Sequence, residues 1–162
     1  MTTRGQAATA RGAVPRAGEG ASVADLAAIE LRRVAEVLQV DHVSLFVPDP
    51  DVLERSTALA ATGVPLATAL PEYASVVHRV LVTGRVQEVH QGATDPRGAR
   101  SALATPLLLD QRAIGALLVV TLREIRRLGL FEAQVLGRAT DVLIARILAP
   151  ARPSDRFTRE VP

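Results

Sequence analysis

The sequence contains no cysteine and no lysine, and it is poor in aromatic residues. The absence of cysteine excludes disulfides, thiolate catalysis, iron–sulfur clusters and cysteine-bearing zinc sites. Because aromatic residues make up only 2% of the chain, few rings can stack on a nucleobase, a haem or a flavin. No apolar run approaches the roughly 18 residues of a membrane-spanning helix, and the first residues lack the apolar core of a secretion signal. We therefore expect a cytoplasmic protein that makes no use of a membrane.

Charge gives no sign of a nucleic-acid partner. All 19 basic residues are arginines, and 17 acidic residues leave a formal net charge of only +2. The sequence pI near 10.3 follows from the lack of lysine and cysteine and from a single tyrosine, which leave little to buffer the alkaline range. Acidic and basic residues alternate along the chain without a basic block, which argues against nucleic-acid binding.

Composition divides the chain into three parts. With 162 residues, of which 48% are hydrophobic, it suits one domain with a sizeable core. Residues 1–21 are rich in small residues and arginine without periodicity, so we expect a disordered leader. Residues 22–149 form the expected domain, and residues 150–162 an expected C-terminal tail.

Hydrophobic periodicity and turn residues predict eight elements in this domain. They are helix 22–40, strand 42–47, strand 56–62, helix 71–83, strand 86–89, a hairpin of strands 100–109 and 113–122, and helix 130–148. Val43, Leu45 and Val47 alternate with His42, Ser44 and Phe46, the period of a half-buried strand. Pro106 and Gly115 within the hairpin predict local irregularity.

This order of elements resembles the GAF domain family. The segment Val80–Val86 is similar to the helix end and following strand of that family, and Ser101, Pro106 and Gly115 have the spacing of its last hairpin. The resemblance implies an α/β (α+β) fold with a central antiparallel sheet flanked by helices. The PAS fold and the effector domains of some transcription regulators are the alternatives.

The resemblance also implies a function. It indicates a stand-alone sensory module that binds a small molecule between the sheet and its helix-and-loop cover and signals in trans to an unidentified partner protein. The implied ligand-binding residues are Ser44, Phe46, Tyr73, Val77, His90, Asp95, Arg97, Arg100 and Ser101. The guanidinium groups of Arg97 and Arg100 suit a carboxylate or phosphate, although each alone is typical of an ordinary surface arginine.

Catalysis is not expected, because the sequence has no serine–histidine–acid arrangement, phosphate loop or paired catalytic carboxylates. Its three histidines lack a neighbouring carboxylate cluster and make a poor metal site. Some GAF domains bind haem through a histidine, which here requires His78 or His90 to point into the pocket; the cofactor is left open. One alternative function is a dimeric scaffold whose pocket is filled by its own leucine and valine side chains, and an enzyme of unknown type is another.

Two charged residues fall within the apolar stripes of the first and last helices. Glu30 lies among the apolar positions of helix 22–40, and Arg146 among those of helix 130–148. An unpaired buried charge is costly, so we hypothesise an ion pair between them, within or between subunits; the alternative is that both reach solvent from the stripe margin. The resemblance implies that these two helices pack together and form a homodimer. The expected interface residues are Glu30, Val34, Val135, Val142 and Arg146.

Overall fold

The computed structural model describes residues 22–49, 51–52, 55–92, 98, 100–123 and 126–148. The expected leader (1–21) and tail (150–162) lie outside the described residues. The elements are α1 (Val23–Leu38), β1 (His42–Pro48), β2 (Ser56–Gly63), α2 (Leu66–Ala69), α3 (Tyr73–Thr83), β3 (Gln87–Gln91), β4 (Arg100–Leu109), β5 (Arg112–Thr121) and α4 (Leu130–Leu148).

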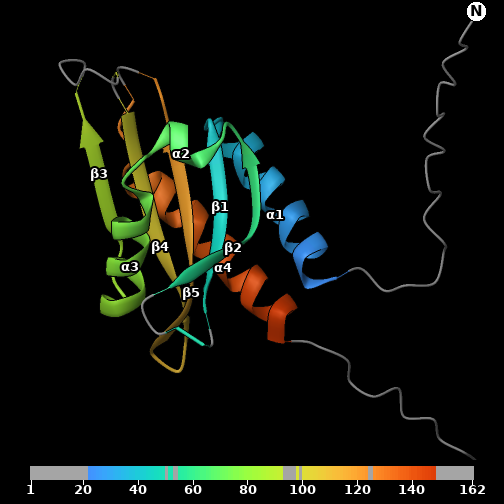
Figure 1. The fold of residues 1–162 in the computed structure, drawn as a ribbon. Helices are drawn as coiled ribbons and strands as arrows, with labels where there is room; N and C mark the ends of the chain where they lie inside the picture. The colour runs from blue at the N-terminus through green and yellow to red at the C-terminus, as the bar shows by residue number, and fades with distance from the viewer. Residues whose placement is uncertain are drawn as a thin grey trace, which may run out of the picture.

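The strands form one antiparallel sheet in the order β2-β1-β5-β4-β3. Helices α1 and α4 pack on one face and α2 and α3 on the other (Figure 1). Two apolar cores result: leucines and valines under α1 and α4, and smaller side chains under α3. The predicted fold class, a central antiparallel sheet flanked by helices, is confirmed.

The start of α1 is fixed by a capping box, in which side chain and backbone satisfy each other's free groups. The Ser22 hydroxyl accepts from the Asp25 backbone N–H at 3.1 Å, and the Asp25 carboxylate accepts from the Ser22 N–H at 3.0 Å. The carboxylate also accepts from the Ser22 hydroxyl, and these bonds lower the pKa of Asp25. The predicted first helix is confirmed and ends at Leu38, where Gln39 adopts a left-handed conformation with φ 50°.

The predicted hairpin is the β4–β5 pair. Its turn has two residues instead of the expected three, because Arg112 belongs to β5 and pairs with Leu109. The two turn residues, Asp110 and Gln111, have positive φ of 48° and 65°, as a type I′ turn requires. The register shifts between Leu107 and Leu108, which confirms the irregularity predicted from the proline and glycine. Gly115 is required for a close approach, since a Cβ there would lie 2.8 Å from the Phe46 carbonyl oxygen.

Two further details of the prediction are wrong. Strand β1 is buried on both faces from His42 to Phe46 rather than half-buried, because it pairs with β2 and β5 and lies between the two helical layers. The helix expected from residue 71 begins at Tyr73, after a turn, and is preceded by the unpredicted α2. Four residues are too few for a helical periodicity to be read from sequence.

Candidate functional site

A cavity of about 260 Å³ lies on the α2/α3 side of the sheet, where β1, β2 and the start of α2 meet. It is lined by His42, Ser44, Phe46, Ala58, Ala61, Thr62, Gly63, Val64, Pro65, Leu66, Ala67 and Tyr73. Three alternate residues of β1, His42, Ser44 and Phe46, form the floor of the cavity, because alternate side chains of a strand point to the same face.

The turn after β2 forms one wall of the cavity and is tied to the start of β1. The Val64 N–H donates to the Asp41 carbonyl oxygen at 2.8 Å. Gly63, with φ 94°, makes this approach possible, since a Cβ at that position would lie 2.1 Å from the same oxygen. Only glycine fits this conformation without displacing the backbone.

His42 is 2% exposed, and its hydrogen bond fixes which ring nitrogen carries the proton. Nδ1 lies 2.6 Å from the Val64 carbonyl oxygen, which can only accept, so Nδ1 bears the hydrogen. Nε2 is therefore a bare acceptor; it is buried and has no hydrogen-bond partner within the described part of the chain. Burial lowers the pKa of His42, against the opposing hydrogen bond to Val64, so the ring is neutral near pH 7.

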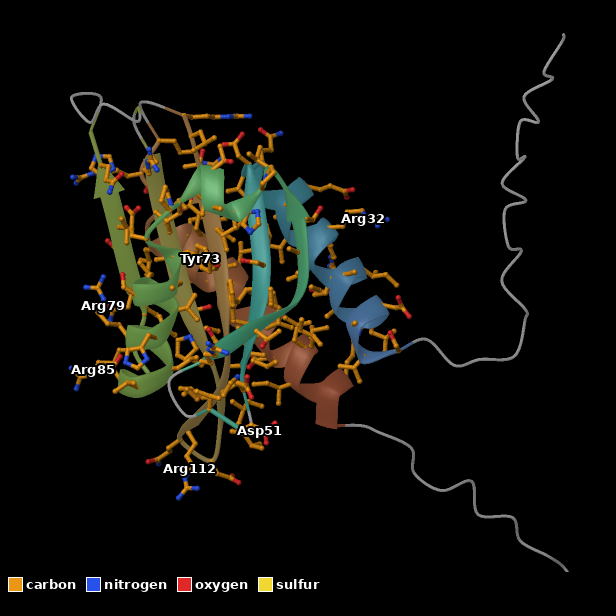
Figure 2. The ribbon with its side chains drawn as sticks, in the orientation of Figure 1. Arg32, Asp51, Tyr73, Arg79, Arg85 and Arg112 are labelled. Carbon is orange, nitrogen blue, oxygen red and sulfur yellow. The ribbon has the colours of Figure 1, made fainter. Side chains whose placement is uncertain are left out.

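Ser44 is the second polar group of the cavity floor. Its side chain is fully buried, and its hydroxyl has no hydrogen-bond partner among the described residues. Beside it, the ring of Phe46 stacks on Tyr73 with 5.8 Å between ring centroids and an interplanar angle of 25°. Figure 2 shows Tyr73 in front of the sheet near its middle, with Arg79 and Arg85 pointing away from the sheet on the outer side of α3. The cavity thus joins two buried polar atoms to an aromatic wall.

The structure brings together three of the predicted ligand-binding residues, Ser44, Phe46 and Tyr73. Val77 is buried in the core beneath α3 and does not line the cavity. The prediction missed His42, although the same alternation places it on the face of Ser44 and Phe46. Its position at the start of the strand gave no indication that the turn after β2 would enclose it.

Other predicted residues lie elsewhere. Ser101 lies on the α1/α4 side of the sheet, where its hydroxyl accepts from the N–H of Leu128, just before α4, at 3.2 Å. His90 pairs with it in register on β3. Both line a separate hollow of about 220 Å³ beside Arg127 and Leu128. The sheet therefore separates them from Ser44.

Of the two arginines expected to hold an anion, Arg100 is described, and it does not line the cavity. Arg100 is 2% exposed, and its Nη1 donates to the Ala69 carbonyl oxygen at the end of α2 at 3.3 Å. It thus holds α2 against the sheet. Asp95 and Arg97 lie outside the described residues.

Neither of the histidines considered as a haem ligand, His78 or His90, lines the cavity, and His78 is exposed on α3. No group of three or more histidine, aspartate or glutamate residues suited to a metal ion occurs in the described ranges.

A second hollow, of about 210 Å³, runs between the outer sides of α1 and α4. Glu30, Arg33 and Arg138 are its charged residues, and Val34, Val37, Val135, Ala139 and Val142 complete it. Glu30 is 5% exposed, yet it makes no hydrogen bond or ion pair with any residue that the structure describes. Arg146 is exposed and does not line this groove, so the expected pair with Glu30 does not form within the subunit.

With the fold and its cavity established, the chain can be compared with known proteins. The family model described as GAF domain matches residues 22–143. The chain belongs to the GAF domain family. This family commonly serves in sensing through the binding of small molecules, and its members are generally regulatory or binding modules. No helix among the described residues has the length and apolar character needed to cross a membrane.

Solved structures share the fold at low sequence identity. The GAF domain of a phosphoenolpyruvate-protein phosphotransferase from Acinetobacter is 18% identical, with a TM-score of 0.61 over 80% of this chain and 84% of that one. The second GAF domain of DevS from Mycobacterium smegmatis is also 18% identical, with a TM-score of 0.58 over 79% and 95%. A free methionine-R-sulfoxide reductase from Neisseria meningitidis, solved with its substrate, is 16% identical, with a TM-score of 0.60 over 78% of each chain. No curated protein sequence matches.

Proposed function

We propose that this GAF domain is a cytoplasmic sensory module that binds a small molecule in the cavity lined by His42, Ser44 and Tyr73 and signals to a separate partner protein. One observation carries the proposal: two residues that line the cavity, His42 and Ser44, each hold a buried polar atom, Nε2 and Oγ, without a partner among the described residues. Buried polar groups are nearly always satisfied, so a ligand that bonds to them would be favoured.

The alternative, a scaffold whose pocket is filled by its own side chains, fits the cavity less well. Leucines and valines fill the sheet face under α1 and α4. The cavity side instead carries small residues such as Ala58, Ala61 and Ala67, which leave about 260 Å³ of space. Concave, mostly apolar sites with a few polar groups are the usual form of a small-molecule site.

A thermal-shift screen of small metabolites on the full chain tests binding, because a ligand that binds only the folded state raises the Tm. Ala61 is exposed at the edge of the cavity, opposite Ser44 in the β1–β2 register. We expect Ala61→Trp to cover the cavity and abolish the shift. Thr57→Trp is the matched control, since Thr57 is exposed on the same strand opposite Val47. A shift unaffected by Ala61→Trp, or a screen without any hit, would contradict the proposal.

We also propose that a second copy of this chain covers the α1/α4 groove. The two helices carry large exposed apolar side chains: on α1, Ile29 and Val37 are each 55% exposed, and on α4, Phe131 is 62% exposed. Val37 also lines the groove. Glu30 lies buried in it without a described partner, beside Arg33 and Arg138. In a two-fold interface each copy contributes the same patch to the other, so Glu30 of one copy would meet an arginine of the other.

Sedimentation of charge variants tests this interface. Glu30→Arg and Arg138→Glu should each weaken self-association, because each places like charges in the seam. The double variant restores opposite charges and should recover the dimer. Arg79→Glu, on the outer side of α3, is the control and should leave association unchanged. Unaltered association in both single variants would remove the proposed interface.

A further inference from the structure

The cavity's own atoms specify the kind of molecule it can hold, and this inference rests on the function proposed above. The first constraint comes from His42. Because its Nδ1–H is committed to the Val64 carbonyl oxygen at 2.6 Å, Nε2 is left as an acceptor. A ligand group that meets it must therefore donate a hydrogen bond. A carbonyl, ether or ring nitrogen without hydrogen would leave this buried nitrogen unpaired.

The second constraint comes from Ser44, two residues further along β1. Its hydroxyl can both donate and accept, so it imposes no direction on a hydrogen bond, but it adds a second polar contact on the same face of the strand. Pairing a buried hydroxyl that otherwise lacks a partner in the described structure is favourable. The ligand is thus expected to be polar along the edge that lies on β1.

The third constraint is charge. None of the described residues that line the cavity is an arginine, aspartate or glutamate, and the histidine is neutral near pH 7 because burial lowers its pKa. An ion entering this site would lose hydration with no opposite charge to replace it. The nearby arginine, Arg100, is buried under α2 and donates to the Ala69 carbonyl. An uncharged ligand is therefore favoured over a carboxylate or a phosphate.

The fourth constraint is size and shape. A cavity of roughly 150 Å³ holds a benzene molecule, so about 260 Å³ holds one ring with substituents or two small fused rings. Beside the polar groups, the lining includes the stacked rings of Phe46 and Tyr73. Aromatic side chains pack favourably against other rings, which favours a flat ligand.

We propose that the cavity binds an uncharged, ring-sized molecule that donates an O–H or N–H hydrogen bond to Nε2 of His42 and makes its second polar contact with Ser44. Phenol-like and neutral nitrogen-heterocycle compounds belong to this class. Nucleotides and carboxylic acids, which are charged near pH 7, do not.

Three probes that share one ring separate these features. Phenol carries the O–H donor and is neutral at pH 8. Anisole replaces that hydrogen by a methyl group, so it adds apolar surface and loses the donor, and benzoate carries a negative charge. Each is titrated into the ¹⁵N-labelled full chain up to about 10 mM, the range in which molecules of this size bind. The shifts of the Val64 and Tyr73 amides and of the His42 ring nitrogens are followed.

We expect phenol to bind about tenfold more tightly than anisole or benzoate, the factor that corresponds to one net hydrogen bond. The Nε2 resonance of His42 should move with phenol and not with anisole. A site that recognised only apolar surface would instead favour anisole. In His42→Asn the side-chain amide keeps a donor for the Val64 carbonyl and removes Nε2, so phenol should lose its advantage. His90→Asn, on the other side of the sheet, is the matched control.

Ser44→Ala is a second variant that preserves His42, and it should bind phenol several-fold more weakly than the natural protein. Equal or tighter binding of anisole or benzoate at these resonances would overturn the ligand class and leave the cavity as a binding site. The ligand class would also be overturned if a compound from the screen binds in the cavity while none of the three probes shifts the resonances of the cavity residues. If neither the probes nor the screen reaches the cavity, both proposals fall.

Discussion

Two buried serines on opposite faces of the sheet should respond oppositely to the same substitution. Ser44 is fully buried with no hydrogen-bond partner among the described residues. Ser101, 3% exposed, accepts from the Leu128 N–H at 3.2 Å. An unsatisfied buried polar group costs about 1–3 kcal/mol. Ser44→Ala removes such a group, whereas Ser101→Ala creates one at the Leu128 N–H.

We expect Ser44→Ala to raise the free energy of unfolding by about 1 kcal/mol, near the low end of that range because removing the oxygen enlarges the cavity. Ser101→Ala should lower it by about 1–3 kcal/mol. For a domain of this size each kcal/mol changes the Tm by roughly 3–5 °C. The Tm of Ser44→Ala should therefore lie above that of the natural protein, and the Tm of Ser101→Ala below it.

Urea unfolding followed by circular dichroism measures both changes, and equal m-values would show that the transitions are comparable. The phenol titration makes the test sharper, because the Ser44→Ala protein should unfold with a higher free energy than the natural protein and yet bind phenol more weakly. If Ser44→Ala is destabilised as much as Ser101→Ala, the Ser44 hydroxyl is satisfied in the ligand-free protein. The reasoning about the cavity would then be wrong.

Three further predictions concern other parts of the chain. Gly63→Ala should lower the free energy of unfolding in urea by more than about 2 kcal/mol, because φ is 94° and the added Cβ would lie 2.1 Å from the Asp41 carbonyl oxygen. A decrease below about 1 kcal/mol would show that the turn tolerates a side chain at this position. Burial lowers the pKa of His42 in the folded protein. As the pH falls below about 6.5, His42 therefore takes up a proton in the unfolded chain before it does so in the folded protein. The free energy of unfolding should drop between pH 7 and 5. His42→Asn should flatten that drop and the exposed His78→Asn should not. Burial raises the pKa of Glu132, but the hydrogen bond from the Gly129 N–H at 2.8 Å and the charge of Arg126 outweigh burial and lower the pKa overall. Glu132→Gln should therefore destabilise the start of α4 by about 0.5–1 kcal/mol in thermal unfolding. An unchanged Tm would contradict this.

Much of the fold could be predicted from the sequence, because the signals are local. The capping pair Ser22 and Asp25, the glycine that ends α3 and the residues of the β4–β5 turn act over three or four positions. The apolar periods of α1 and α4 extend this to whole elements. The family resemblance adds that the strands form one central antiparallel sheet flanked by helices, which no local period contains.

The site could be predicted only in part, because it depends on register and layering between distant strands. Alternation put Ser44 and Phe46 on one face of β1, but which face Ser101 and His90 share depends on how β3, β4 and β5 pair. Likewise, Arg100 was a plausible anion ligand until the packing of α2 placed the Ala69 carbonyl against it.

The sequence alone determined most of the helices and strands, though not α2, and that Glu30 falls in an apolar stripe, since these follow from contacts within a few residues. Tertiary structure decided that β1 is covered on both sides and that a turn encloses His42. It also decided that Glu30 shares a groove with Arg33 of its own helix and Arg138 of α4, and not with Arg146. The physical reason is that burial and the pairing of polar atoms arise when segments distant in the chain come together. A side chain's neighbours on its own strand or helix do not reveal them.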